Sequence, residues 1–297
     1  MRGSRFSGPR MAGWELWIMV SQRLSSIVAA IAFPLFIAAC TDLSAVRDFA
    51  KTSSAVVESR AVIDGYVAHP SRMRAFFPPD RLALLEEQSR LRQNQKAGLE
   101  GLQQAIGTYM TTLGSLAADE TVSFNTNPLV SQASKVGVIA PDLVGVVTAA
   151  GDLLLRAASS AWRQRETSRL IGDVHPHLVR MTDALRQFVT EAAAADDAQA
   201  LSAIDAHYSL LIRRSRDPAG MAALGEWRIV REEAVRSREA ARTAYLSALA
   251  KVRDGHQILF DRRNDLSLGD TIRQLRAAEA ALRELGKVLE PLVARAL

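Results

Sequence analysis

Histidine and aspartate lie close together at two places, and these are the residues with the clearest capacity for chemistry. One run holds Asp173, His175, Pro176 and His177, and a second holds Asp205 and His207. Imidazole and carboxylate groups are common zinc ligands, so either run could bind a metal. Neither run places two histidines four residues apart, the spacing that puts both on one face of a helix. Pro176 instead predicts a turn, with solvent-exposed histidines where a helix starts.

The remaining histidines and the loop motifs give no stronger indication of catalysis. His256 continues the apolar series Tyr245, Leu249 and Val252, which is typical of the edge of a helical core. The sequence has no glycine-rich phosphate loop, no nucleophile elbow and no zinc-protease helix motif. We therefore expect a non-catalytic protein that needs no cofactor and no metal.

The one cysteine, Cys40, follows a segment typical of export signals. With a single cysteine, no disulfide can form within the chain. A positive start at Arg23 leads into 13 mostly apolar residues, Ile27–Ala39. This run is shorter than the roughly 20 residues that cross a membrane, and Pro34 interrupts it. The pattern predicts a cleaved signal rather than a membrane span.

The end of this segment, Ile37-Ala38-Ala39-Cys40, resembles the lipobox of bacterial lipoproteins. The resemblance implies cleavage before Cys40, attachment of a diacylglyceryl group to its thiol, and a membrane tether. In that family an aspartate directly after the cysteine commonly retains the protein in the inner membrane. Here the position holds Thr41, so we expect the outer membrane, with the protein facing the periplasm. The alternative is an ordinary signal cut after Ala32, which would leave Cys40 a passive thiol.

Much of the excess positive charge lies in this leader. The chain has a formal net charge of +5, and four arginines but only one acidic residue precede Cys40. Residues 40–297 therefore carry 33 basic and 31 acidic side chains, a net charge of +2. This balance gives little support to nucleic-acid binding. Met11 and Met19 are alternative translation starts that would shorten the leader and keep the signal.

Apolar residues recur at alternating steps of three and four along most of residues 40–297, which predicts helices that pack against one another. Four series are the clearest: Leu99, Leu102, Ile106, Tyr109, Leu113 and Leu116; Leu143, Val147, Ala150, Leu154, Ala157 and Ala161; Leu178, Met181, Leu185, Phe188 and Ala192; and Leu275, Ala278, Leu282, Leu285, Leu289, Leu292 and Ala296. We expect an all-α fold, an elongated antiparallel helical bundle with long coiled-coil-like helices. An intermolecular coiled coil is the alternative use of the same series.

Prolines and polar residues divide these series into about six helices. The predicted spans are 43–67, 80–118, 141–170, 176–214 with a kink at 192–200, 218–264, and a last helix capped by Asp270, with a connector at 125–141 that holds a possible short helix at 128–135. Residues 1–39 are then a signal peptide and residues 40–297 a single domain.

Two predicted connectors contain aromatic residues that we expect to be exposed. The first contains the candidate partner contacts Arg72, Met73, Arg74, Phe76 and Phe77, and the second is 121–125. Arginine and aromatic side chains are typical anchors of protein interfaces. In the alternative interpretation, Phe76 and Phe77 fold back and close one end of the bundle.

These features together predict a lipid-anchored protein of the cell envelope that binds or scaffolds an envelope protein partner. It would reach the membrane through lipidated Cys40 and bind no nucleic acid. Two alternatives remain: a periplasmic bundle that binds a small ligand or metal near His175 and His177, and an inhibitor or immunity-like lipoprotein.

Overall fold

The computed structural model describes residues 42–118, 120, 133–137, 140–158 and 163–296. Cys40, the signal segment and the connector 121–125 lie outside the described residues, as does most of the possible short helix 128–135, of which residues 133–135 are helical. Residues from Leu43 onward form one compact unit. The part of the chain that is described contains helices and no strand, which confirms the predicted all-α helical bundle.

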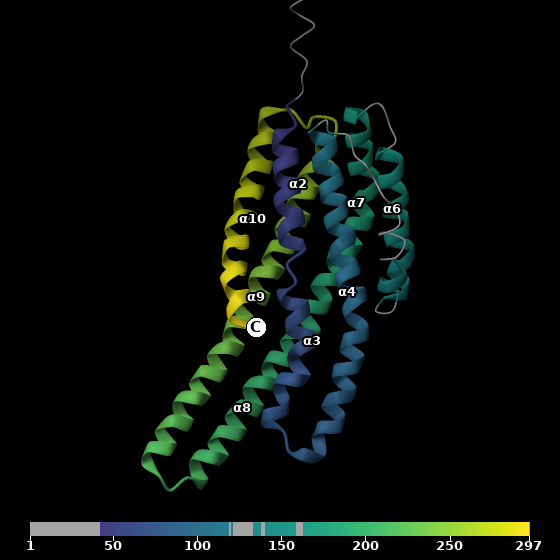
Figure 1. Cartoon of the computed structure of the whole chain (residues 1–297). Helices are drawn as coiled ribbons and strands as arrows, with labels where there is room; N and C mark the ends of the chain where they lie inside the picture. Colours follow the sequence, from purple (N-terminus) through teal and green to yellow (C-terminus); the bar gives the residue numbers. More distant parts are fainter. Residues whose placement is uncertain (1–41, 119, 121–132, 138–139, 159–162, 297) are drawn as a thin grey trace, which may run out of the picture. The chain divides into compact units, whose positions relative to one another are not determined.

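The helices pack side by side (Figure 1). Their bounds are α2 Ser44–Val57, α3 Ala61–Met73, α4 Leu82–Ala117, α6 Val144–Ala158, α7 Arg163–Phe188, α8 Ala194–Arg214, α9 Pro218–Asp261 and α10 Gly269–Ala296, with 3-10 turns η1 Arg74–Phe76, η2 Pro79–Arg81 and η3 Pro141–Leu143, and a π-helical turn η4 Val189–Ala193. At 1.5 Å per residue, the 44 residues of α9 extend over about 66 Å.

The larger hydrophobic core, called the main core below, lies among α2, α4, α7, α9 and α10, with α6 packed on α7 (Figure 1). Its largest fully buried side chains include Phe49, Tyr109 and Tyr245. The predicted series supply a large share of the buried side chains: all six residues from Leu99 to Leu116 are buried, as are Leu275, Leu282 and Leu289. The periodicity therefore identified the core-facing side of these helices correctly.

A smaller cluster, the distal core, joins α3 and the start of α4 to α8 and α9. It consists of Met73, Leu85, Ala200, Ile204, Tyr208 and Val235, with Phe76 and Phe77 packed against it. The two phenylalanines thus fold back onto the bundle, as the alternative interpretation expected. Met73 is only 2% exposed, so the prediction that it is an exposed contact is wrong.

Two prolines that were expected to separate helices lie inside them. Pro70 is within α3 and Pro176 within α7. A proline has no N–H for the carbonyl four residues earlier. For Pro70 that carbonyl belongs to Tyr66, and Nη1 of Arg92 donates to it at 2.9 Å. A side chain from α4 therefore replaces the missing backbone donor, which no local rule of sequence could reveal.

The expected helix 43–67 is instead divided between α2 and α3. The carbonyl of Val57 accepts a hydrogen bond from the Tyr245 hydroxyl at 2.9 Å, and the carbonyl of Ser59 accepts one from Gln103 Nε2 at 2.9 Å. Gln103 also donates to the Tyr245 hydroxyl at 2.7 Å. These buried partners satisfy backbone groups at the break, as buried polar groups require.

At the other helix boundaries, residues near in the sequence were enough to predict roughly where a helix begins or changes. Asp217 caps α9 through bonds from the backbone N–H groups of Ala219 and Gly220, as an N-cap aspartate does. The last helix begins one residue before the predicted cap, so Asp270 lies within its first turn, where its carboxylate accepts from the side chains of Arg273 and Gln274. The expected kink at 192–200 was placed too late in the chain, because the π-helical turn lies at Val189–Ala193 and residues 194–200 belong to α8.

Candidate binding pocket

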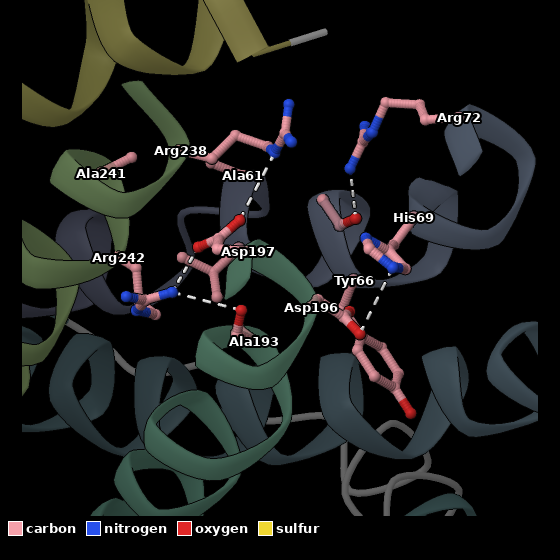
Figure 2. Close-up of a pocket in the computed structure, with 12 residues that line it drawn as sticks. Ala61, Tyr66, His69, Arg72, Ala193, Asp196, Asp197, Arg238, Ala241 and Arg242 are labelled. Atoms are coloured by element: carbon pink, nitrogen blue, oxygen red, sulfur yellow. Dashed lines mark hydrogen bonds and ion pairs between the residues drawn. The ribbon is translucent and has the colours of Figure 1, made fainter. Parts of the chain in front are cut away.

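A pocket rich in arginine lies where α3, the junction of η4 and α8, and α9 meet (Figure 2). The cavity measures about 30 Å³. Its apolar wall consists of small residues, Ala61, Val62, Gly65, Ala193 and Ala241, and its polar wall of Tyr66, His69, Arg72, Asp196, Asp197, Arg238 and Arg242. The space corresponds to two or three water-sized spheres, at roughly 10–15 Å³ for each. A ligand group of a few atoms fits it.

Asp196 is fully occupied by neighbours. Nη1 and Nη2 of Arg92 donate to its two carboxylate oxygens at 2.5 and 2.8 Å, a bidentate pair. His69 Nε2 lies 3.7 Å from the same carboxylate and 3.1 Å from Oε1 of Gln199. Burial lowers the pKa of His69, and the charge of Asp196 opposes this shift only in part. His69 is therefore neutral at pH 7.

Asp197, the next residue, is held by α9. Nη1 of Arg242 donates to its carboxylate and, at 3.2 Å, to the carbonyl of Ala193. Nε of Arg238 lies 3.7 Å from the other carboxylate oxygen. Burial raises the pKa of Asp197, and the two arginines act in the opposite direction. Because Ala193 ends the π-helical turn, Arg242 ties that turn to α9 at the pocket wall.

Arg72 is only partly satisfied by its neighbours in the pocket. Its Nη2 donates to the carbonyl of Gly65 at 2.5 Å, while its buried Nε has no hydrogen-bond partner among the residues that the structure describes. Burial, and next the nearby positive charge of Arg238, lower the pKa of Arg72 to about 10. Burial also lowers the pKa of Arg238. The positive charges of Arg72 and Arg238 thus act on each other at the same pocket, where both side chains are labelled in Figure 2.

The lining carries an excess of positive charge. It contains three arginines and two aspartates, and the partner of Asp196 is a fourth arginine, Arg92. Each aspartate has a close arginine of its own, Arg92 for Asp196 and Arg242 for Asp197. Among the described residues Arg72 has no ion pair of its own, and Arg238 shares Asp197 with Arg242. Buried charges are costly unless paired, so this arrangement is suited to an anion.

Arg72 is predicted from the sequence as a partner contact in an exposed connector between helices. It lies in α3 and faces the pocket, whereas Arg74 is exposed and pairs with Glu86 at 3.2 Å. Phe76 packs edge-on against His207 at 5.5 Å between ring centroids. The structure therefore does not bring the five predicted contacts together at one surface. The aspartates were missed, although they lie within 192–200, where the apolar series loses its phase.

The histidines that were expected at an exposed turn belong to helix α7. His175 and His177 are half-buried, and Nδ1 of His175 lies 3.1 Å from Nδ1 of the buried His256. The other ring nitrogen of His256 bonds to the Tyr109 hydroxyl at 2.5 Å. Within the described ranges, no group of three or more histidine, cysteine or acidic side chains is arranged to hold a metal ion.

The chain was compared with protein-family models, with curated proteins and with solved structures, and no significant match was found. Among the helices of the described segments, none is both long and apolar enough to cross a membrane.

Proposed function

We propose that this protein is a lipid-anchored binding module of the bacterial cell envelope, tethered to the outer membrane by Cys40 and facing the periplasm. The lipobox-like sequence supports the tether. The arginine-rich pocket supports binding, and the observation that carries the proposal is the buried Nε of Arg72, which has no hydrogen-bond partner in the described part of the chain. The bundle holds the pocket at the junction of three helical segments, and the partner is an envelope protein that engages this region.

The pocket also favours a second candidate, the binding of a small free ligand in the periplasm. A cavity of about 30 Å³ accommodates a small anionic group, and its apolar wall is made of alanine, glycine and valine. This candidate differs from the metal-binding alternative near His175 and His177, because the ligand site lies between α3, α8 and α9 instead.

Membrane fractionation of cells that produce Cys40→Ser tests the tether. We expect the wild-type chain in the outer-membrane fraction, and the variant either in the soluble periplasmic fraction or unprocessed. A variant recovered from the outer membrane exactly as the wild type is would overturn the lipid anchor.

A photo-crosslinking amino acid at Glu239 tests partner binding near the pocket. Glu239 follows Arg238 and is 53% exposed on its side chain, so the probe does not fill the cavity. Val288 on α10, 49% exposed, is the matched control position. We expect a discrete protein adduct from position 239 that is lost in Arg72→Gln and absent from position 288. Equal adducts from both positions, or none from position 239, would overturn the proposal.

A further inference from the structure

The geometry points to a carboxylate group as the ligand of this pocket, held between Arg72 and Arg238. This inference rests on the proposed function, since it takes the pocket to be the site of binding. It names the chemistry of what is bound. Three features of the pocket support it: the donors that remain free, the size and shape of the cavity, and the composition of its walls.

The free donors belong to two residues. The carboxylates of Asp196 and Asp197 already accept from Arg92 and Arg242. A guanidinium group has five N–H donors, and Arg72 uses one of them, toward Gly65. Arg238 makes a 3.7 Å ion pair with an aspartate that Arg242 shares. A carboxylate placed between Arg72 and Arg238 would accept from both and relieve their mutual repulsion.

The shape and the walls of the cavity favour a carboxylate among the oxyanions. The cavity of about 30 Å³ admits a small group, and the small side chains of Ala61, Val62 and Ala241 suit a methyl or methylene group attached to a planar carboxylate. Inorganic phosphate and sulfate are tetrahedral and have no apolar atoms to place against this wall. The fork of a guanidinium group also matches the two oxygens of a carboxylate.

The carboxylate has two possible sources, a free small organic acid or a glutamate side chain that a protein partner inserts. Both present the same group on a short aliphatic stem. The experiment therefore needs one probe for each source and a tetrahedral anion for comparison.

Thermal unfolding of the purified full chain in detergent, at constant ionic strength set with sodium chloride, provides the measurement. The probes are sodium propionate, the peptide acetyl-Gly-Glu-Gly-amide with its Gln counterpart, and inorganic phosphate. We expect a saturable rise in Tm with propionate, with the Glu peptide, or with both, because a ligand that binds only the folded state stabilises it. Propionate alone identifies a free acid as the source, and the Glu peptide alone identifies a side chain.

The variants Arg72→Gln and Arg238→Gln should each weaken carboxylate binding about 10- to 100-fold, the loss expected for one charge-assisted hydrogen bond. Arg74→Gln and Arg231→Gln are the matched controls, since both arginines are exposed and lie in the chain near Arg72 and Arg238. Arg238→Lys keeps the charge and should retain binding in part. If the Gln variants are less stable, isothermal titration at 10 °C measures the same affinities on folded protein.

Three results would overturn the inference: no response to any carboxylate, the same response in both Gln variants as in the wild type, or a response to phosphate alone. Its failure can be told apart from that of the proposed function. An adduct from position 239 without a carboxylate response supports partner binding and overturns the carboxylate inference. A carboxylate response without the adduct supports carboxylate binding and overturns the protein partner.

Discussion

Two of the places where polar groups are buried in this bundle satisfy them in opposite ways. In the main core, Tyr245, Gln103 and the carbonyl of Val57 form a closed neutral set of hydrogen bonds. In the pocket, charged side chains are buried together and positive charge is left over. A closed neutral set stabilises a fold and leaves no donor for a ligand, whereas an unbalanced charged set leaves donors available.

The two regions also differ in hydrophobic support. Phe49, Tyr109 and Tyr245 lie inside the main core, whereas the pocket lies at its margin, where Val62 belongs to the main core and Ala193 packs against it. The pocket therefore combines apolar support on one side with charged pairs on the other. We therefore expect substitutions that remove a charge to lower the free energy of unfolding mainly at the pocket. Substitutions that change the size of a side chain should lower it mainly in the main core.

The largest effect is expected from breaking the Arg92–Asp196 pair. Asp196→Asn keeps the shape of the side chain and leaves the charge of Arg92, whose side chain is 15% exposed, without its counter-ion. Removal of one partner of a buried pair costs about 3–5 kcal/mol. We expect a loss of this size in the free energy of unfolding, measured by urea denaturation.

Asp142→Asn is the matched control for that measurement. Asp142 pairs with Arg180 at 3.0 Å, but both side chains are more than half exposed. Surface pairs contribute about 0–1 kcal/mol, so the control should change stability very little. Equal effects of the two substitutions would contradict the distinction between the pocket and the surface.

A second, smaller effect concerns pH and the histidines of the two regions. Burial, and next the charge of His175, lower the pKa of His256 to about 3. In the unfolded chain this pKa is about 6.5, so the unfolded state binds the proton first. As the pH falls from about 6.5 toward 3, His256 therefore removes stability, by at most about 1.4 kcal/mol per pH unit.

Urea denaturation of His256→Gln between pH 7 and pH 4 checks this expectation. The variant should lose less stability on acidification than the wild type, even if it is less stable at pH 7. His69→Gln should flatten the profile less, because the charge of Asp196 opposes the effect of burial on the pKa of His69. If the free energy of unfolding of His256→Gln depends on pH as steeply as that of the wild type, His256 is not the source of this pH dependence.

Much of the helix packing could be predicted from the sequence, because a repeat of three and four residues is a local property. The series from Leu99 to Leu116 shows this, since every member is buried. Pro70 could not be interpreted locally, because Arg92 on another helix satisfies the carbonyl that the proline leaves free. The pocket could not be predicted for the same reason. Arg72, Asp196 and Arg238 meet only through the packing of three helices, and in the sequence each resembles an ordinary surface charge.

The smallest expected effect compares two glycines that are both buried in helices of the main core region. A Cβ at Gly255 would overlap the ring of Phe49, which is fully buried and has no space to move. A Cβ at Gly107 would meet the carboxylate of Glu58, which is exposed and can turn away. Overpacking costs about 1–3 kcal/mol, and alanine is about 1 kcal/mol better than glycine within a helix. Gly255→Ala should therefore lower the free energy of unfolding by up to about 2 kcal/mol, whereas Gly107→Ala should leave it unchanged or raise it. Urea denaturation of both variants measures the difference, and a loss in Gly107→Ala as large as that in Gly255→Ala would show that Glu58 is held in place as rigidly as the ring.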